Sequence, residues 1–345
     1  VSEPVVTIAI EPKHPKDLPK LVEALRRITV EDPNLIVKIN EESGETLLSG
    51  MGVLHLEIAT SLILETGLEI TTTQPLINYR ETIRNSAGPI MSKSPNKHNK
   101  IFMRIEPLGE EIIELIKNGQ IHEDLERKQM AKLLREKGWS ADEAKKVSAV
   151  DISGNILVDE TKGVQFIQES MDSIRSGFDD VIHSGPIAHE TLRGVKFVLH
   201  HFVPHEDPAH RGLAQLMPAT RRAMLGSMLL ADPALLEPIL GMEIKCPQEQ
   251  IGTVAGILSG KRGKLLNVEQ KGVITIIQGE VPASETFDLS EVMRGGTAGM
   301  ALWNTYFKTW QVVPQSIFKT LVNDVRKRKG LNPEPPAADE FVDTE

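Results

Sequence analysis

The sequence predicts an α+β protein in which two small ferredoxin-like βαββαβ sandwiches flank a third domain of strands and helices. One observation is the order strand, helix, strand, strand, helix, strand within residues 1–78. The same order returns within residues 237–313, although the residues themselves do not repeat. The segment between them, residues 79–236, is a less regular mixture of strands and helices. The repeated order is that of the split βαβ fold.

In the first flank, two kinds of hydrophobic spacing alternate. VVTIAI alternates as a strand, and HPKDLPKLVEALRRITVED has apolar residues at helical spacing. LIVKIN and ETLLSGMG are strands separated by the turn EESG, and VLHLEIATSLILETG is a helix closed by Gly67. LEITTTQP is the last strand. These elements complete one βαββαβ sandwich.

The second flank repeats this organisation. PILGMEIKCP is a strand, and QEQIGTVAGILSG is a helix that ends at Gly260. KLLNVEQ and VITIIQGEVP form a hairpin across Lys271 and Gly272. SETFDLSEVMRGGTAG is the second helix, and GMALWNTYFKTWQVV is the last strand.

The middle segment begins with strands at YRETI, at the run up to IMSKS and at IFMRIEPL, with the turn SPNKHNK between the last two. A polar helical stretch follows over residues 109–147, then the strand NILVD and the helix VQFIQESMDSIRSGFDDVIHSG. The strand LRGVKFVLHHFV, the loop PHEDPAHRG and the helix MPATRRAMLGSMLLADP complete the segment. After the second flank, SIFKTLVNDVRKRKG is a helix. We expect residues 314–345 to pack back on the middle domain.

The composition limits the possible functions. A net charge of -9 argues against a protein that coats nucleic acid over its whole surface, but it permits a local basic patch. The single Cys246 excludes an internal disulfide and indicates a reducing cytoplasm. The longest apolar stretch, 223–242, contains prolines and carboxylates, so we expect no transmembrane helix, and we expect no signal peptide.

Two expectations concern the chain ends. The chain begins with Val1 rather than Met, followed at once by strand-like sequence, which we interpret as a fragment or a processed chain. Its last residues, PEPPAADEFVDTE, are rich in proline, alanine and carboxylates, and this composition predicts partial disorder.

The turn within residues 92–104 is the first candidate for a functional site. It carries Lys93, Lys97, Lys100 and Arg104 and no acidic residue, in a chain that is acidic overall. Its short polar side chains leave the ammonium groups free to reach phosphates. A solvated hairpin tip without a ligand is the alternative, because exposed turns are commonly polar.

The second candidate is the histidine-rich loop that follows a strand. Four of the ten histidines lie in the run from His200 to His210. Strand alternation predicts that one of His200 and His201 points inward and the other outward. Pro204 and Pro208 hold the loop extended, so His210 is projected from a stiff loop. Of Arg221 and Arg222 on the next helix, only one can share a face with the loop.

A metal site is the alternative role for these histidines. The candidate ligands are His201, His205, Glu206, Asp207 and His210. The chain has no HExxH and no CxxC motif, however, and no GxSxG or GxxxxGK[ST] motif either. We therefore read SGKRGK as a helix end and turn, and RGGTAG as a helix cap and loop. A metal-dependent enzyme remains an alternative function.

Several long motifs together closely resemble the C-terminal part of elongation factor 2, the ribosomal translocase family of archaea and eukaryotes. They are MSKSPNKHNK, HEDPAHRGLAQLMPATRRAM with LLADPALLEPI, GTVAGILSGKRGKLL and RKRKGLNPEPP. The resemblance covers essentially the whole chain. HRGLAQ stands where eukaryotic members have HRGGGQ, which favours an archaeal source.

The resemblance implies that residues 1–78 are domain III, residues 79–236 with 314–345 are domain IV, and residues 237–313 are domain V. Domains III and V would be ferredoxin-like, and domain IV would resemble ribosomal protein S5. The GTP-hydrolysing domain with its GTP and Mg²⁺ would lie upstream of Val1. This fragment would then bind no cofactor or metal and would not itself be an enzyme.

The resemblance also implies functional residues. His210 matches the histidine that is converted to diphthamide and then ADP-ribosylated by toxins. The residues expected to contact ribosomal RNA at the tip are Ser94, Pro95, Asn96, Lys97, His98, Asn99, Asp207, Pro208, Ala209, Arg211 and Gly212. The implied partners are the ribosome with its RNA and proteins, tRNA with mRNA, and the diphthamide-synthesis enzymes. We expect a cytoplasmic monomer without membrane contact. A paralogous GTPase of ribosome maturation or splicing, or a standalone RNA-binding module, is the alternative.

Overall fold

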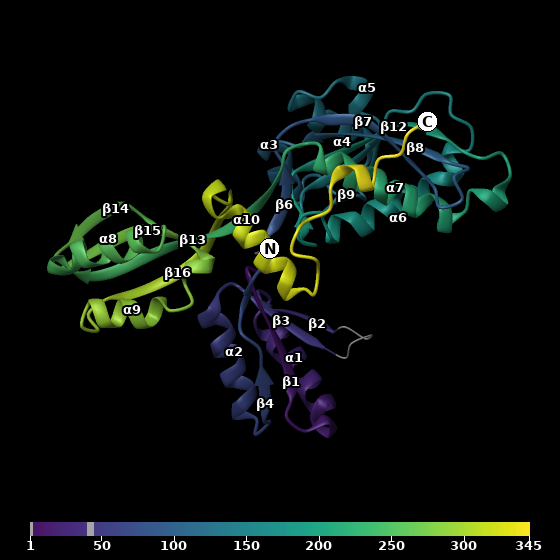
Figure 1. Cartoon of the computed structure of the whole chain (residues 1–345). Coiled ribbons are helices and arrows are strands. Elements are labelled where there is room, and N and C mark those ends of the chain that lie inside the picture. The colour runs from purple at the N-terminus through teal and green to yellow at the C-terminus, as the bar shows by residue number, and fades with distance from the viewer. Residues whose placement is uncertain (1–2, 40–44) are drawn as a thin grey trace. The chain divides into compact units, whose positions relative to one another are not determined.

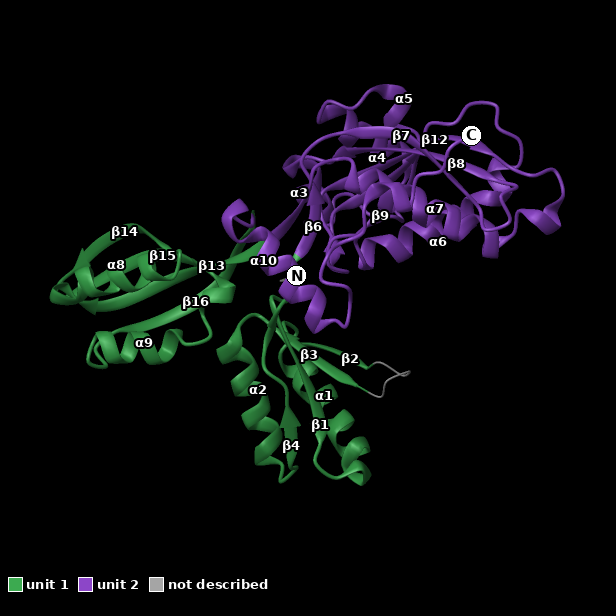
Figure 2. Cartoon of the chain, in the orientation of Figure 1, with its two compact units in different colours: residues 1–79, 237–311 green, residues 80–236, 312–345 purple. Residues whose placement is uncertain are grey.

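The computed structural model describes residues 3–39 and 45–345, which form two compact units (Figure 2). One unit contains residues 1–79 and 237–311, and the other contains residues 80–236 and 312–345. The predicted turn EESG, residues 41–44, lies outside the described residues. The division into three domains stays a prediction.

The first sandwich consists of an antiparallel sheet and two helices (Figure 1). Its sheet has the order β2-β3-β1-β4, with β5 also paired to β1. Its helices bury the apolar stripes that predicted them, such as Leu21 and Leu25 in one helix and Leu56 and Ile63 in the other. The elements are β1 (Val6–Pro12), η1 (Pro15–Asp17), α1 (Leu18–Glu31), β2 (Ile36–Ile39), β3 (Thr46–Gly50), α2 (Val53–Glu65), β4 (Ile70–Thr72) and β5 (Leu76–Ile77).

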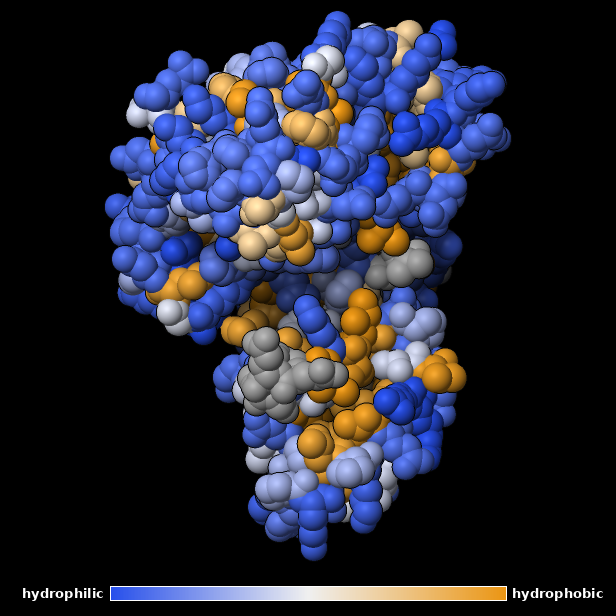
Figure 3. Space-filling view, turned by 90° about the vertical axis from the view of Figure 1, so that its right-hand side faces the viewer, coloured by the Kyte–Doolittle hydropathy of each residue, from blue (hydrophilic) through white to orange (hydrophobic). Residues whose placement is uncertain are grey.

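This sandwich also leaves apolar side chains exposed. Figure 3 shows apolar side chains gathered on one face of it, and its exposed large apolar residues include Ile36, Ile39 and Leu76.

The second sandwich has the same strand order as the first. β15 lies between β14 and β13, and β16 pairs with the other edge of β13. In both sandwiches the first strand is therefore central, and the ferredoxin-like prediction is confirmed for both flanks. The elements are β13 (Pro233–Pro247), η3 (Gln248–Gln250), α8 (Ile251–Gly260), β14 (Lys264–Lys271), β15 (Ile274–Pro282), η4 (Ala283–Glu285), α9 (Leu289–Gly296) and β16 (Leu302–Val312).

The other unit is built on a sheet of order β7-β8-β12-β10-β9, in which β10 and β12 are parallel and the other pairs are antiparallel. Its strands and helices are β6 (Arg80–Ile83), β7 (Ala87–Lys93), β8 (Lys100–Pro107), α3 (Glu110–Lys117), α4 (Arg127–Glu136), α5 (Ala141–Ala144), β9 (Val147–Asp151), β10 (Asn155–Asp159), α6 (Ile167–His183), β11 (Thr191–Leu192), β12 (Val195–Val203), η2 (Pro208–His210), α7 (Leu213–Leu229), α10 (Gln315–Arg328) and η5 (Ala338–Glu340).

Both faces of this sheet are buried. Phe197 and Leu199 of β12 belong to one apolar core together with residues of α6 and α7, whereas Val198 belongs to a second core with residues of α3 and α4. This alternation explains why β12 reads as a nearly continuous apolar run. The polar helical stretch of residues 109–147 therefore covers the face of the sheet that α6 and α7 leave free.

Two element predictions need correction. β9 was not predicted, because its residues follow a polar helical stretch without a clear break. Helix α7 begins at Leu213, whereas the sequence predicted that it begins at Met217. Pro218 instead lies inside the helix, where burial of Leu216 and Ala219 compensates for the lost hydrogen bond.

The prediction of a partly disordered tail is wrong. Ser92 Oγ donates to the carbonyl of Phe341 at 2.5 Å, and the N–H of Asp343 donates to the carbonyl of Met91 at 2.9 Å. Phe341 and Val342 pack against the core formed with α6 and α7. Two apolar residues in a polar tail thus provide enough buried surface to fix it along β7.

The predicted alternation of His200 and His201 is also wrong. Both residues are exposed, because the register of β12 against β8 shifts between Leu199 and His201. Such a β-bulge adds one residue to a strand and places two successive side chains on the same side. His200 Nδ1 lies 3.0 Å from a carboxylate oxygen of Glu160, and the ring of His201 contacts that of Phe102.

Candidate nucleic-acid interface

The turn between β7 and β8 folds through its own polar side chains. Asn96 Oδ1 accepts hydrogen bonds from Ser94 Oγ at 2.5 Å and from the His98 N–H at 3.0 Å. The Lys97 N–H donates to the Ser94 carbonyl at 2.8 Å, and Lys97 has a φ of 64°. Ser94 and Asn99 are fully buried. The side chain at position 97 is therefore exposed by a turn that its neighbours hold from inside.

The histidine loop forms a short turn of its own. Asp207 Oδ1 accepts the Ala209 N–H at 3.0 Å, and the His210 N–H donates to the Asp207 carbonyl at 3.0 Å. Pro208 begins the 3-10 turn η2, where a fixed φ is favourable. Residues 206–210 are exposed, as predicted for a stiff projecting loop.

These two segments are joined by direct hydrogen bonds. The side-chain amides of Asn99 and Asn96 both donate to the backbone carbonyl of His210, at 2.7 and 2.9 Å. Asn99 Oδ1 accepts the His205 N–H at 2.8 Å, and Gln215 Oε1 of α7 accepts the Asn96 N–H at 2.9 Å. The hairpin turn and the histidine loop thus form one structure, which we call the tip, comprising residues 94–99 and 204–212.

Three imidazole rings meet on the tip. The ring centroids of His98, His205 and His210 lie 4.8–5.1 Å apart, and the side chain of His210 is 47% exposed. The ring of His201 lies against Phe102 instead. Among residues 3–39 and 45–345, no group of three or more His, Cys, Asp or Glu side chains is arranged to hold a metal ion. The tip therefore presents a cluster of three imidazole rings in tilted and edge-to-face contact.

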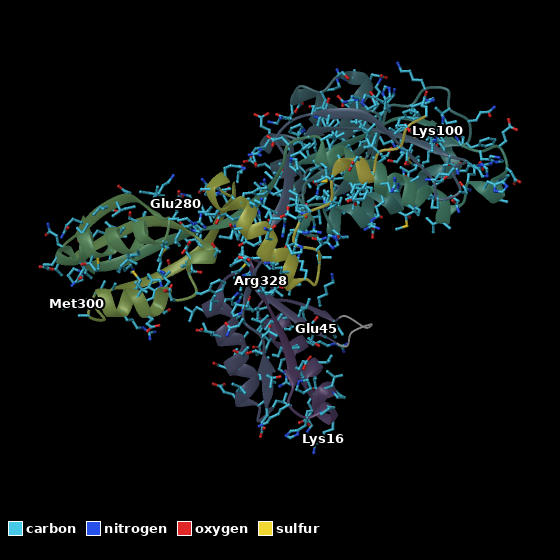
Figure 4. All side chains as sticks on the ribbon, viewed as in Figure 1. Lys16, Glu45, Lys100, Glu280, Met300 and Arg328 are labelled. Atoms are coloured by element: carbon cyan, nitrogen blue, oxygen red, sulfur yellow. The ribbon has the colours of Figure 1, made fainter. Side chains whose placement is uncertain are left out.

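The basic residues predicted for the hairpin have different environments. Lys97 is exposed and Lys100 is half-buried, and within the described chain neither ammonium group forms an ion pair. Figure 4 labels Lys100, at the start of β8. Arg104, in contrast, bonds Glu160 and Glu106 at 2.6–3.2 Å, and the bonds to Glu160 and Glu106 raise the pKa of its guanidinium. The guanidinium of Arg104 is therefore held by carboxylates of its own unit.

The ordered tail adds a carboxylate near the tip. Asp343 Oδ2 accepts the Lys93 N–H at 2.7 Å and lies 3.4 Å from Arg222 Nη2. Burial alone would raise the pKa of Asp343, but the Lys93 N–H and the charges of Arg222 and Lys97 lower it below its usual value. Asp343 is therefore an anion at neutral pH. It partly neutralises the positive charges of Arg222 and Lys97 near the hairpin.

The tip residues predicted from the sequence differ in their exposure. Three of them are buried, namely Ser94, Asn99 and Arg211. Asn96 is half-buried, and the others are exposed, namely Pro95, Lys97, His98, Asp207, Pro208, Ala209, His210 and Gly212. Gln215 and Asp343 were not predicted, because only the tertiary structure brings α7 and the tail to the hairpin.

The remaining motifs have structural roles. In SGKRGK, α8 ends at Gly260, and Arg262 bonds the buried carboxylate of Glu237 at 2.9 and 3.1 Å. In RGGTAG, α9 ends at Gly296 and Thr297 caps it. Both agree with the predicted helix ends. Cys246 is buried in β13, and this burial raises the pKa of its thiol.

Comparison with known proteins gives matches along the chain. Residues 1–74 match the family model of elongation factor G domain III, residues 119–232 match that of domain IV, and residues 234–321 match that of the elongation factor G C-terminus.

Curated relatives cover the chain nearly end to end. Elongation factor 2 of Cenarchaeum symbiosum is 57% identical over 345 residues, which is 100% of this chain and 47% of the relative. Elongation factor 2 of Staphylothermus marinus is 51% identical and that of Metallosphaera sedula 50% identical, each over 99% of this chain and 47% of the relative. The chain thus spans about half the length of these relatives. No helix within the described residues is long and apolar enough to cross a membrane.

Proposed function

Because the chain belongs to the elongation factor 2 family, we propose that it forms the part of an archaeal-type translocase that promotes movement of tRNA and mRNA on the ribosome. The tip would enter the decoding centre and contact RNA there. The observation that carries this proposal is the double hydrogen bond from Asn96 and Asn99 to the carbonyl of His210. This contact makes one rigid projection from two segments that are far apart in the sequence.

The surface of the tip suits RNA in two ways. Lys97 and Lys100 supply cations that can meet phosphates, in a chain of net charge -9. The rings of His98, His205 and His210 supply faces on which unpaired bases can stack. A local patch of this kind allows contact with RNA without general binding to nucleic acid.

We propose further that His210 is the residue converted to diphthamide and ADP-ribosylated by toxins. Its half-exposed ring supports this, because a modifying enzyme needs access to an imidazole carbon. The proposed partners are therefore the ribosome, tRNA with mRNA, and the diphthamide-synthesis enzymes. We propose a cytoplasmic monomer.

We assign GTP hydrolysis, with its GTP and Mg²⁺, to a part of the full-length factor other than these residues. These residues would act mechanically, by steric and phosphate contacts, once GTP-driven changes elsewhere reorient them. A paralogous GTPase of ribosome maturation or splicing is less favoured, because the relatives described above are all elongation factors 2. A mass spectrum of the native protein that shows an unmodified His210 would speak for the paralogue.

The test uses the full-length factor with Lys97→Ala and His210→Ala, and Lys16→Ala as a matched control. Lys16 is an exposed lysine in the first sandwich, far along the chain from the tip (Figure 4). Both tip variants should slow translocation of tRNA and mRNA in a single-round assay, whereas the control should leave the rate unchanged. Unchanged rates for both tip variants would overturn the assignment of the tip.

A further inference from the structure

We propose that Arg211 is a positioning residue that fixes the histidine loop and does not contact RNA, and that Asn99 performs the same task from the opposite side. This inference rests on the proposed function of the tip. It also revises the expectation that both side chains face RNA.

The guanidinium of Arg211 is engaged on all its nitrogens. Nε and Nη2 donate to Glu169 Oε1 at 3.1 and 2.5 Å, and Nη1 donates to the backbone carbonyls of His205 and Glu206 at 3.1 and 2.5 Å. Its Cζ atom lies over the ring of Phe166, 3.8 Å from the centroid. Only 6% of the side chain is exposed. Four of its five N–H groups are occupied, so little capacity remains for a phosphate.

The partners of Arg211 lie at the start of α6. Phe166 is the N-cap residue and has a φ of 62°, a left-handed conformation that is unfavourable for a bulky residue. This conformation places its ring beneath the guanidinium. Glu169 lies in the first turn of the same helix, where a carboxylate is favourable. The histidine loop is therefore anchored to a helix of the core, through one arginine.

Asn99 holds the other side of the loop. It is fully buried, accepts the N–H of His205 and donates to the carbonyl of His210. Asn99 thus bonds the backbone N–H of His205, and Arg211 bonds the backbone carbonyl of the same residue. Between them they fix both ends of residues 205–210, from which the ring of His210 projects.

Replacement of Arg211 by lysine distinguishes a positioning role from a contact with phosphate. A lysine can replace an arginine at a phosphate, because both are cations. It cannot stack on Phe166 and bond two carbonyls and a carboxylate together, because an ammonium has neither a plane nor a fork of donors. Arg211→Lys should therefore behave like Arg211→Ala.

The first measurement is amide hydrogen exchange at residues 205–210 of the 345-residue chain. Arg211→Lys, Arg211→Ala and Asn99→Asp should each speed exchange there at least tenfold, while Lys97→Ala leaves it unchanged. Asn99→Asp keeps the acceptor for His205 and removes the donor to His210. If an Arg211 variant does not fold, Glu169→Gln, at a half-exposed position, should give a smaller acceleration. Wild-type exchange in the folded Arg211 variants would overturn the proposal.

The second measurement is the salt dependence of binding to isolated small ribosomal subunits. Lys97→Ala should reduce the slope of log K against log salt by about one, the value for one lost phosphate contact. Arg211→Lys should weaken binding about fivefold with an unchanged slope. A slope reduced by Arg211→Ala as by Lys97→Ala, or full rescue by Arg211→Lys, would overturn the positioning role. If the wild-type chain itself does not bind, the proposed function fails, while the exchange result still decides the role of Arg211.

Discussion

Glu81 and Arg326 both bond the backbone of Ile187, in the loop of residues 184–190: Glu81 binds its N–H and Arg326 binds its carbonyl. Glu81 Oε1 accepts the N–H of Ile187 at 2.5 Å, and Arg326 Nη1 donates to the carbonyl of Ile187 at 2.8 Å. Glu81 Oε2 also accepts the N–H groups of Ala188 and Glu190 at 3.1 and 2.8 Å. Strand β6 and helix α10, which are far apart in the sequence, are thereby tied to the same loop.

The buried carboxyl of Glu81 predicts a pH-dependent stability. Burial raises its pKa from 4.5 to about 7, despite the three backbone N–H groups that favour the anion. Because the folded chain holds this proton more tightly than the unfolded chain, the contribution of Glu81 to stability is highest below pH 4.5 and decreases as the pH rises towards 7. The free energy of unfolding should lose roughly 3 kcal/mol in this window. Urea unfolding between pH 4.5 and 8 measures it.

Glu81→Gln is the control for this prediction. Glutamine cannot titrate, so the part of the pH dependence of unfolding that Glu81 causes should disappear in the variant. This should hold even though the glutamine amide is a poorer acceptor for the three N–H groups. An identical pH slope in both proteins would show that Glu81 is not the group responsible.

Gly185 should tolerate no side chain. A Cβ at this position would lie 2.5 Å from the Glu81 carboxyl group, inside the loop that the carboxylate holds. We expect Gly185→Ala to lower the free energy of unfolding by about 1–3 kcal/mol through overpacking. Gly252→Ala is the matched control, because nothing lies within 4 Å of its Cβ and the residue is in helix α8. This control should stabilise by about 0.5–1 kcal/mol.

The tail should contribute to the stability of the unit that contains the tip. Phe341→Ala removes a partly buried ring from the core and should cost about 1–2 kcal/mol, less than a fully buried phenylalanine. It should also expose residues 331–345 to protease. Leu302→Ala removes a side chain that is 71% exposed in β16 and should cost much less. Equal effects of both variants would contradict the packing of the tail.

Asp343→Asn tests the charge of the tail. Because the folded-state pKa of Asp343 is lowered, its contribution to stability is present above the unfolded pKa and is lost as the pH falls through the folded value. We expect a loss of about 1 kcal/mol at pH 7 in urea unfolding, which vanishes in acid. A loss that persists at pH 2 would point to a cause other than charge.

Chelation tests the metal-site alternative. His201 contacts Phe102 and lies outside the cluster formed by His98, His205 and His210, so the predicted ligands do not converge. EDTA should leave the melting temperature unchanged, and elemental analysis should find less than about one tenth of an equivalent of zinc, because structural zinc contributes folding energy directly. Stoichiometric zinc, or a melting temperature lowered by EDTA, would restore this alternative.

Local patterns predicted most of the elements, because hydrophobic period and turn residues act over a few positions. The hairpin across Lys271 and Gly272 and the end of α8 at Gly260 were predicted in this way and are confirmed. Predictions failed where the conformation of a segment depends on contacts with residues that are far away in the sequence. Helix α7 continues through Pro218 because its apolar face is buried, and the bulge at His201 depends on the register against β8.

The candidate site shows the same division. The sequence located the hairpin turn and His210, since basic turns, prolines and a long motif are visible without a structure. It could not show which polar side chains face inward. Asn99 and Arg211 look like exposed loop residues in the sequence, yet both are buried, whereas Lys97 is exposed.

The sequence by itself determined the order of elements, the ferredoxin-like strand order of both flanks, the family and the position of His210. Only the tertiary structure decided that Arg104 is paired, that Phe341 is packed and that Asn99 and Arg211 bind the backbone of the histidine loop. The physical reason is the range of the interactions. Periodicity and turn chemistry are set by neighbours in the chain, whereas burial and hydrogen bonding of a side chain are set by residues that only folding brings near.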